Sequence, residues 1–211
     1  MPFYAVKIGK NPGIYNTWSE CQKNTSGFSG AKFHKFNTKE EAEDYLKEDD
    51  YKLNNYDSNK LEIHYPCFFV DGSFNERKEL VGSGLIFKLN ENEKERIFKI
   101  KYDAKVGSQA RISRNIYGEI NAALKAVAIA IENRLKEINI YYDYIGIEMW
   151  VAEKNPWNVA KEKKFITDYI ELVNIARNNY KIKINFYKVP AHSGIELNER
   201  VDLLAKEAAG F

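Results

Sequence analysis

The stretch IHYPCFFVDGSF, residues 63–74, is rich in aromatic and β-branched residues, which is typical of a strand buried in a sheet. Two stretches of the same kind follow, ELVGSGLIFKLN at residues 79–90 and ERIFKIKYDAK at residues 95–105. The short polar segments between them predict tight turns. We therefore expect three successive strands, each joined to the next as a hairpin.

The rest of the chain alternates helical and strand patterns. Apolar residues at helical spacing predict a long helix over residues 115–138. The elements expected after it are a strand at 138–144, helices around 145–152 and 160–178, a strand at 181–189 and a helix at 198–209. Three hairpin-linked strands followed by this alternation predict an α/β fold with a mixed five-stranded sheet flanked by helices.

A smaller module precedes this domain. It alternates strand, turn, helix, strand and helix, with NPGIY (11–15) as the turn and with Thr17 and Thr38 as the helix N-caps. We expect a small α+β domain over residues 1–46. Residues 47–62 are polar and without periodicity, which is typical of a linker, and the larger domain is expected over 63–211.

The bulk composition excludes several classes of protein. A hydrophobic content of 44%, with aromatic residues making up 14% of the chain, is enough for a packed core. The net charge of +2 excludes a chain that is basic throughout, but residues 1–36 carry five Lys and one acidic residue. Cys21 and Cys67 have no metal-ligand spacing. Without a secretory signal or a membrane-spanning stretch, a soluble cytoplasmic protein is expected.

Four carboxylates occupy distinct settings: Asp71 in FFVDGSF, Glu119 in NIYGEINAA, Asp143 in IYYDYIGI and Asp202 in NERVDLLAKEA. Each alone has an ordinary explanation, namely a hairpin turn, an acid at a helix start, a lone acid after a strand, and a solvated helix face. Acidic groups gathered in one cleft repel each other unless a cation binds among them. Together they indicate a divalent-metal site.

In this order the motifs VDGS, GE.NAAL.A, YYDY and HSG…NERVD resemble the ribonuclease H family, type 1, over roughly residues 64–210. The resemblance implies that Asp71, Glu119, Asp143 and Asp202 bind two Mg²⁺ ions, with Mn²⁺ able to substitute. It implies an endoribonuclease that hydrolyses the RNA strand of RNA/DNA hybrids and leaves 5′-phosphate and 3′-hydroxyl ends. Such two-metal cleavage uses hard oxygen ligands, as these carboxylates provide.

The resemblance also implies supporting roles for other residues. His192 in PAHSGIE takes an accessory catalytic role in proton transfer or product release. Ser73 and Asn115 are expected to contact sugars of the hybrid, and Asn198 to support the cleft. Arg114 stands where the family often has a small hydroxyl residue, and its charge could bind a phosphate instead. The basic handle of some members is missing.

The module YAVKIGKNPGIYNTWSECQKNTSGFSGAKFHKF resembles the hybrid-binding domain that precedes many type 1 ribonucleases H and also occurs in viroplasmin-like proteins, with the match covering residues 3–46. The resemblance implies that Trp18 and Phe33 pack against deoxyribose of the DNA strand. It implies that Lys32 and Lys35 hold phosphates or RNA sugars. A small aromatic core with incidental lysines is the alternative.

Two rival functions remain open. The first is a catalytically inactive protein that binds RNA/DNA hybrids or double-stranded RNA, and the second is an integrase-like strand-transfer enzyme on the same fold. Retention of all four acids argues against the first. The lack of room for extra DNA-binding regions argues against the second. The expected partner is an RNA/DNA hybrid and not a membrane, and a monomeric catalytic domain is expected.

Overall fold

The computed structural model describes residues 2–26, 28, 31–36, 38–39, 41–43, 45–46, 61–152, 156, 163–190 and 194–211. The chain divides into two compact units, Met1–Lys60 and Leu61–Phe211. Most of the expected linker lies outside the described residues. No helix in the described part combines the length and the apolar character needed to cross a membrane.

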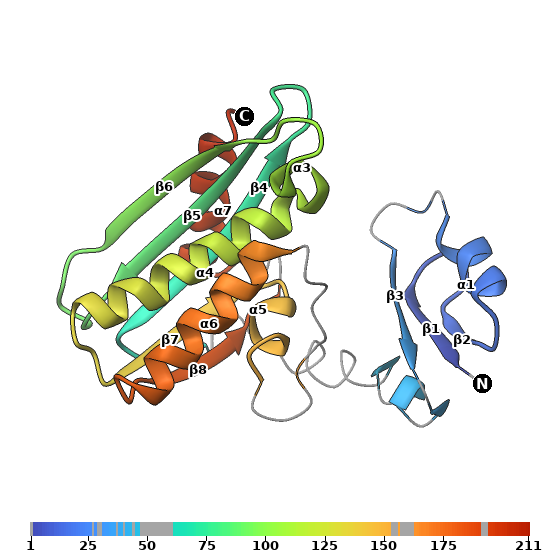
Figure 1. Ribbon diagram of the computed structural model, residues 1–211, viewed down its shortest axis with the longest axis horizontal. Helices are drawn as coiled ribbons and strands as arrows, with labels where there is room; N and C mark the ends of the chain where they lie inside the picture. The colour runs from blue at the N-terminus through green and yellow to red at the C-terminus, as the bar shows by residue number, and fades with distance from the viewer. Residues whose placement is uncertain are drawn as a thin grey trace. The chain divides into compact units, whose positions relative to one another are not determined.

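The first unit is built on a three-stranded antiparallel sheet in the order β2-β1-β3 (Figure 1). Its elements are β1 (Phe3–Ile8), β2 (Gly13–Tyr15), α1 (Trp18–Thr25) and β3 (Lys32–Phe36). The expected turn at 11–15 is wrong in part, because residues 13–15 pair with β1 as a third strand. This pairing covers one edge of a sheet that would otherwise be a marginal hairpin.

Both predicted N-caps of this unit are confirmed. The Thr17 hydroxyl accepts a hydrogen bond from the Glu20 amide at 3.3 Å, and the Glu20 carboxylate accepts the Thr17 amide in return. Thr38 and Glu41 make the same reciprocal pair, ahead of helical residues at 39, 41–43 and 45–46. Each capping box satisfies two donors that a helix start leaves unpaired.

The second unit contains the predicted mixed sheet. Its strands are β4 (Cys67–Asn75), β5 (Leu80–Lys88), β6 (Arg96–Asp103), β7 (Glu137–Tyr142) and β8 (Lys183–Lys188). Its helices are α3 (Gln109–Ser113), α4 (Asn115–Glu132), α5 (Gly146–Met149), α6 (Lys164–Asn178) and α7 (Glu196–Ala208). The strand order is β6-β5-β4-β7-β8, with β4, β5 and β6 antiparallel and β4, β7 and β8 parallel.

Helices cover both faces of this sheet. Figure 1 shows α4 and α6 in front of the strands and α7 behind them. The front layer buries the main core, which includes Phe68, Val70, Ile120, Ile140 and Val173. Burial of these apolar side chains away from water is the main stabilising contribution to the folding of the unit.

Glycines allow the helices to approach the strands closely. A Cβ added to Gly72 on β4 would lie 2.3 Å from the backbone of α4, and one on Gly118 of α4 would lie 2.4 Å from the Gly82 carbonyl oxygen. On the other face, Cβ atoms on Gly82 and Gly84 would lie 2.0 Å and 2.5 Å from carbonyl oxygens of α7. Real Cβ atoms cannot occupy such positions, so only glycine permits this packing.

The substitution Gly118→Ala tests this packing. In an exposed helix interior it would stabilise the protein by about 1 kcal/mol, because glycine is the poorer helix former. Here we expect the opposite sign, with a loss of about 1–3 kcal/mol from overpacking against β5. Thermal unfolding should show a lower melting temperature, whereas Glu132→Ala on the exposed end of the same helix should change it little. A melting temperature raised by Gly118→Ala would contradict the close approach.

Several predicted boundaries differ from those of the structure, and the largest difference is at the end of the long helix. The helix expected over 115–138 ends at Glu132, because Arg134 adopts φ 52°, and β7 begins at Glu137. The short helix α3 was missed because it is polar. It is nevertheless capped, since the Ser108 side chain accepts the Arg111 amide.

Candidate active site

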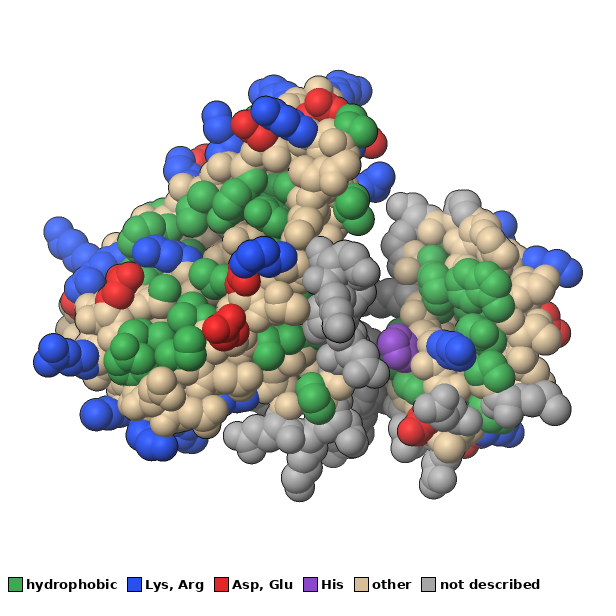
Figure 2. Space-filling model, viewed as in Figure 1, with side chains coloured by type: hydrophobic (Ala, Val, Ile, Leu, Met, Phe, Trp, Pro, Cys, Tyr) green, Lys and Arg blue, Asp and Glu red, His purple; other side chains and the backbone are tan. Residues whose placement is uncertain are grey.

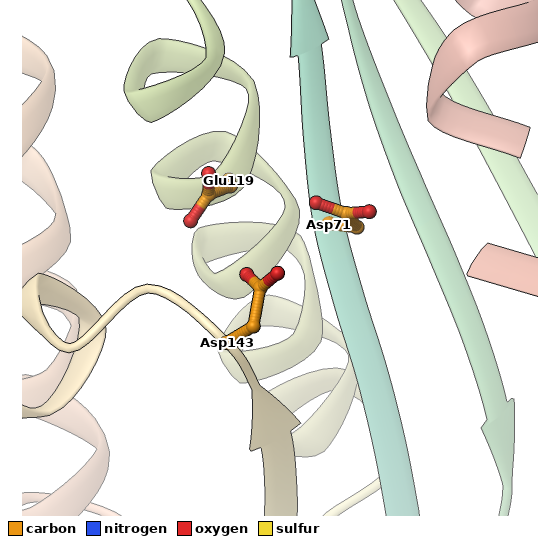
Figure 3. Close-up of side chains that lie close together, drawn as sticks. All are labelled: Asp71, Glu119 and Asp143. Carbon is orange, nitrogen blue, oxygen red and sulfur yellow. The ribbon is translucent and has the colours of Figure 1, made fainter. Parts of the chain in front are cut away.

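Three of the four predicted acids come together at the centre of the sheet. Asp71 lies in the middle of β4, Glu119 in the second turn of α4, and Asp143 directly after β7. One carboxylate oxygen from each lies within 4.8 Å of the others. Figure 3 shows the three side chains directed toward one another from these elements. Because β7 pairs with β4, and α4 packs on β4, the topology itself produces this cluster.

The cluster is electrostatically strained when it holds no cation. Burial and then the charge of Asp143 raise the pKa of Asp71 to about 8, with a further contribution from Asp202 and an opposing hydrogen bond from the Gly72 amide at 2.6 Å. Burial, then Asp143 and Asp71, raise the pKa of Glu119 well above its ordinary value. Like charges crowded in a low-dielectric site disfavour ionisation of all of them.

Glu119 shows most directly that the site fits a cation. Its side chain is 3% exposed, and its Oε2 atom is buried with no hydrogen-bond partner among the described residues. Among the described residues, its Oε1 accepts only a long hydrogen bond of 3.4 Å, from Asn115. An acid at a helix start that interacts with the helix dipole would be solvated, so that ordinary explanation is wrong. A buried carboxylate oxygen without a donor is a hard ligand of the kind that Mg²⁺ prefers.

Asp202 lies on α7 and lines the same cleft as the other three acids. It does not belong to the cluster of Asp71, Glu119 and Asp143 whose carboxylate oxygens lie within 4.8 Å of one another. The cleft has a volume of about 180 Å³. Its Oδ2 atom accepts a hydrogen bond from Lys206 Nζ, one helical turn on, at 2.5 Å. Asp202 therefore borders the cluster while its charge is balanced by a neighbouring lysine.

The structure places the other predicted residues of the cleft as follows. Asn115 and Asn198 line it, and Asn198 is 6% exposed. Ser73 lies two residues beyond Asp71 on β4 and is half-buried, but it is not among the lining residues. His192 lies outside the described residues.

Arg114 lies at the rim rather than in the cleft. It forms the N-cap of α4 with φ 52°, in the left-handed region that side chains rarely adopt. Its guanidinium lies 5.6 Å from the centre of the Phe74 ring and 4.0 Å from the Glu76 carboxylate. Its side chain is 60% exposed, so the charge remains accessible to solvent.

The sequence interpretation missed two residues at this site. Glu199 lines the cleft, and its Oε1 accepts the Gly194 amide at 3.4 Å, which links α7 to the segment before it. Lys206 balances Asp202. Helical spacing could have identified Lys206, because it stands four residues after Asp202 on the same face.

The first unit carries the predicted aromatic residues on one surface. The ring centre of Trp18 lies 5.7 Å from that of Phe33 and 5.8 Å from that of Tyr4. Trp18 is 45% exposed and Phe33 is 40% exposed. Figure 2 shows hydrophobic side chains gathered on the surface of this unit, with a Lys or Arg side chain beside them. We call Tyr4, Trp18 and Phe33 the aromatic platform.

Strand pairing places a positive charge next to the platform. Lys35 on β3 pairs directly with Tyr4 on β1, so both side chains point to the same face of the sheet, and Lys35 is exposed. The neighbouring His34 points to the other face, where its ring contacts Tyr45, and burial lowers the pKa of His34. The side chain of Lys32 lies outside the described part. An exposed aromatic surface beside lysine is typical of nucleic-acid binding.

The raised pKa values of Asp71 and Glu119 predict a pH-dependent response to metal. In the unfolded chain these groups titrate near 4. The metal-free folded protein therefore holds protons that the unfolded chain has released, and its stability falls as pH rises from about 4 toward 8. Because a cation takes the place of those protons, Mg²⁺ should raise the melting temperature more at pH 8 than at pH 6. An equal rise at both pH values would contradict the assignment.

Comparison with known proteins agrees with this geometry. The family model described as RNase H matches residues 64–210, and the model described as Ribonuclease H1 N-terminal domain matches residues 2–46. Ribonuclease H1 of Rattus norvegicus is 25% identical over 260 residues, covering 98% of this chain and 89% of the relative. Ribonuclease H of Saccharomyces cerevisiae is 50% identical over 44 residues, covering 21% of this chain and 13% of the relative.

A solved structure shares the fold. RNase H1 from the halophilic archaeon Halobacterium salinarum NRC-1 superposes with a TM-score of 0.50 at 17% identity, covering 67% of this chain and 95% of that one. The RNase H family model spans well over half of the 211 residues, including all four acids. The chain therefore belongs to the ribonuclease H family and is a ribonuclease H enzyme.

Proposed function

We propose that this chain is an endoribonuclease that hydrolyses the RNA strand of RNA/DNA hybrids with Mg²⁺, or with Mn²⁺ in its place, and leaves 5′-phosphate and 3′-hydroxyl ends. The observation that carries this proposal is the cluster of half-buried Asp71 and Asp143 with buried Glu119, in which Glu119 Oε2 has no partner among the described residues. Carboxylates crowded together without a cation destabilise the fold. A protein that only bound hybrids would not need such a cluster.

The chain's own carboxylates would hold two cations. The charges of Asp143 and Asp202 both raise the pKa of Asp71, so Asp71 lies within electrostatic reach of both and is the best candidate for a ligand shared between two ions. Glu119 and Asp143 would complete one side of the site, and Asp202 the other. When bound, the cations would activate the attacking water and neutralise the charge that develops on the leaving oxygen.

The remaining residues would bind and orient the hybrid. We propose that Asn115 and Ser73 contact its sugars, that Asn198 supports the cleft wall, and that exposed Arg114 binds a backbone phosphate. His192 would assist proton transfer or product release.

On the first unit, the aromatic platform would pack against deoxyribose, where the absence of a 2′-hydroxyl permits close approach. Lys35 and Lys32 would contact phosphates or RNA sugars beside it. In this arrangement the first unit would supply much of the affinity for the hybrid, and the acidic cleft would supply the chemistry.

A cleavage assay tests the proposal. The purified chain is incubated with Mg²⁺ and four labelled duplexes, namely RNA/DNA, RNA/RNA, DNA/DNA and an RNA–DNA chimera. We expect cuts only in the RNA strand of the hybrid, with 5′-phosphate ends, and no cuts in EDTA. Tight hybrid binding without any cleavage in Mg²⁺ or Mn²⁺ would favour an inactive hybrid-binding protein instead.

A further inference from the structure

A second hollow in the second unit lies away from the acidic cleft. It has a volume of about 810 Å³ and is lined by the last turns of α6 and the start of the edge strand β8. Its polar lining consists of three cations and three amides, and no acid is among the described residues that line it. We call this polar lining the basic groove: Asn174, Arg177, Asn178, Lys181, Lys183 and Asn185.

The local structure explains how the groove forms. Arg177 and Asn178 stand three and four residues after Asn174, so the three side chains share one face of α6. Lys181, with φ 57°, turns the chain from α6 into β8, which Lys183 begins. Because β8 pairs with β7 alone among the described strands, its outer edge remains open. The helix face and the strand edge therefore line the groove together.

Two of the three cations in the groove have no acidic partner among the described residues. Lys181 is exposed, and Arg177 Nη1 donates to an uncharged acceptor, the Val151 carbonyl, at 2.6 Å. Lys183 lies 2.9 Å from Glu137, but its side chain is 69% exposed. An ion pair this exposed contributes little to stability, so another anion can take its place. The groove therefore carries positive charge that the described residues do not neutralise.

The groove is separate from the acidic cleft. Lys183 pairs with Glu137 at the start of β7, whereas Asp143 follows the end of that strand. The six residues of β7 span about 20 Å. One strand of a nucleic acid carries a phosphate every ~3.4 Å, so about six nucleotides would cover this distance. Figure 2 shows further Lys and Arg side chains gathered around the end of the unit at which α6 ends in Figure 1.

We propose that the basic groove binds the sugar–phosphate backbone of the hybrid about six nucleotides from the point of cleavage. This inference rests on the proposed function. Arg177, Lys181 and Lys183 would contact phosphates, to which most hydrogen bonds between proteins and nucleic acids are made. Such contacts would add affinity without selecting a base sequence.

The amides of the groove fit the same ligand. Asn174 and Asn178 are exposed, and no hydrogen bond among the described residues engages their side chains. Each amide can donate to a phosphate oxygen or accept from a ribose hydroxyl. Tyr180, next to Lys181 in the sequence, is not among the lining residues. We therefore expect contact with the backbone and no stacking against bases.

The double variant Lys181→Gln/Lys183→Gln removes two charges from exposed positions in the groove. The measurement is the Kd for a labelled hybrid in EDTA at several salt concentrations, because phosphate contacts make the affinity depend on salt. We expect Kd to rise about tenfold at about 0.1 M salt, and the slope of log Kd against log salt to fall by about 2. The melting temperature and the single-turnover rate at saturating enzyme should stay unchanged.

Lys94→Gln/Lys99→Gln is the matched control. Lys94 is exposed before β6, and Lys99 forms an exposed ion pair with Glu207 at 2.9 Å. The change in net charge is the same, but these lysines lie at the opposite edge of the sheet. This control should change neither Kd nor the salt slope. Asn178→Asp is a second variant, which adds a negative charge to the groove without removing a cation, and it should also raise Kd.

The outcomes distinguish this inference from the proposed function. A wild-type protein that neither binds nor cleaves the hybrid would overturn both. If the wild type cleaves the hybrid and the groove variant keeps its Kd and salt slope, the groove assignment alone is overturned, and an acidic peptide becomes the better ligand. An equal rise in Kd in the matched control would show an effect of net charge and would also overturn the groove assignment.

Discussion

Asp71→Asn is expected to abolish cleavage and, at the same time, to raise the melting temperature of the metal-free protein. The loss of activity follows because an amide binds a hard cation less well than the carboxylate of Asp71, which lies in the acidic cluster with Glu119 and Asp143. Loss of several kcal/mol of transition-state stabilisation corresponds to a fall in kcat of roughly 10³-fold or more.

The gain in stability has a separate cause. A pKa raised from 3.8 to about 8 shows that the folded protein disfavours the charge on Asp71. The neutral amide removes that cost, and we expect a gain of about 1–3 kcal/mol, or about 3–10 °C in melting temperature. The measurement is thermal unfolding in EDTA at pH 7, beside single-turnover cleavage in Mg²⁺.

Two further variants control this prediction. Asp143→Asn should behave as Asp71→Asn does, whereas Asp103→Asn, an exposed acid on β6, should affect neither cleavage nor stability. Hybrid binding should survive in all three. If Asp71→Asn abolished both cleavage and hybrid binding and also lowered the melting temperature, the variant would be misfolded. The site assignment would then lack support.

The order of elements could be predicted because the second unit has strongly patterned strands. The runs around Phe68 and Ile86 are apolar on both faces, which matches strands buried between α4 and α7. The boundaries could not be predicted as well. Nothing local to Arg134 indicates a left-handed residue, since the usual signal for a helix end is glycine.

The order of the four acids in the sequence was enough to propose them as metal ligands. Their burial and their neighbours in the fold could not be predicted from the sequence. Asp71, Glu119 and Asp143 are far apart in sequence, and only the pairing of β4 with β7 and the glycine contact of β4 with α4 bring them together. The burial of Glu119 and the lysine beside Asp202 are consequences of packing. The ordinary explanation of Glu119 taken alone, an acid at a helix start, is excluded for that reason.

Trp18→Ala is expected to weaken hybrid binding strongly while leaving the chemical step almost unchanged. Trp18 is the centre of the aromatic platform, in contact with both Tyr4 and Phe33, and nearly half of its surface is free for a ligand. Removal of such a stacking surface costs on the order of 1–3 kcal/mol, which corresponds to a tenfold to hundredfold rise in Kd. Processivity on long hybrids should fall with it.

The measurement compares Kd for a labelled hybrid with the single-turnover rate at saturating enzyme. Tyr180→Ala is a matched control, because Tyr180 is also an aromatic residue about half exposed, at 47%, but it lies on the second unit beyond α6. It should change neither quantity. Unchanged affinity in Trp18→Ala would show that the platform is only the small core of its unit, and the lysines beside it would then have no role in holding the hybrid.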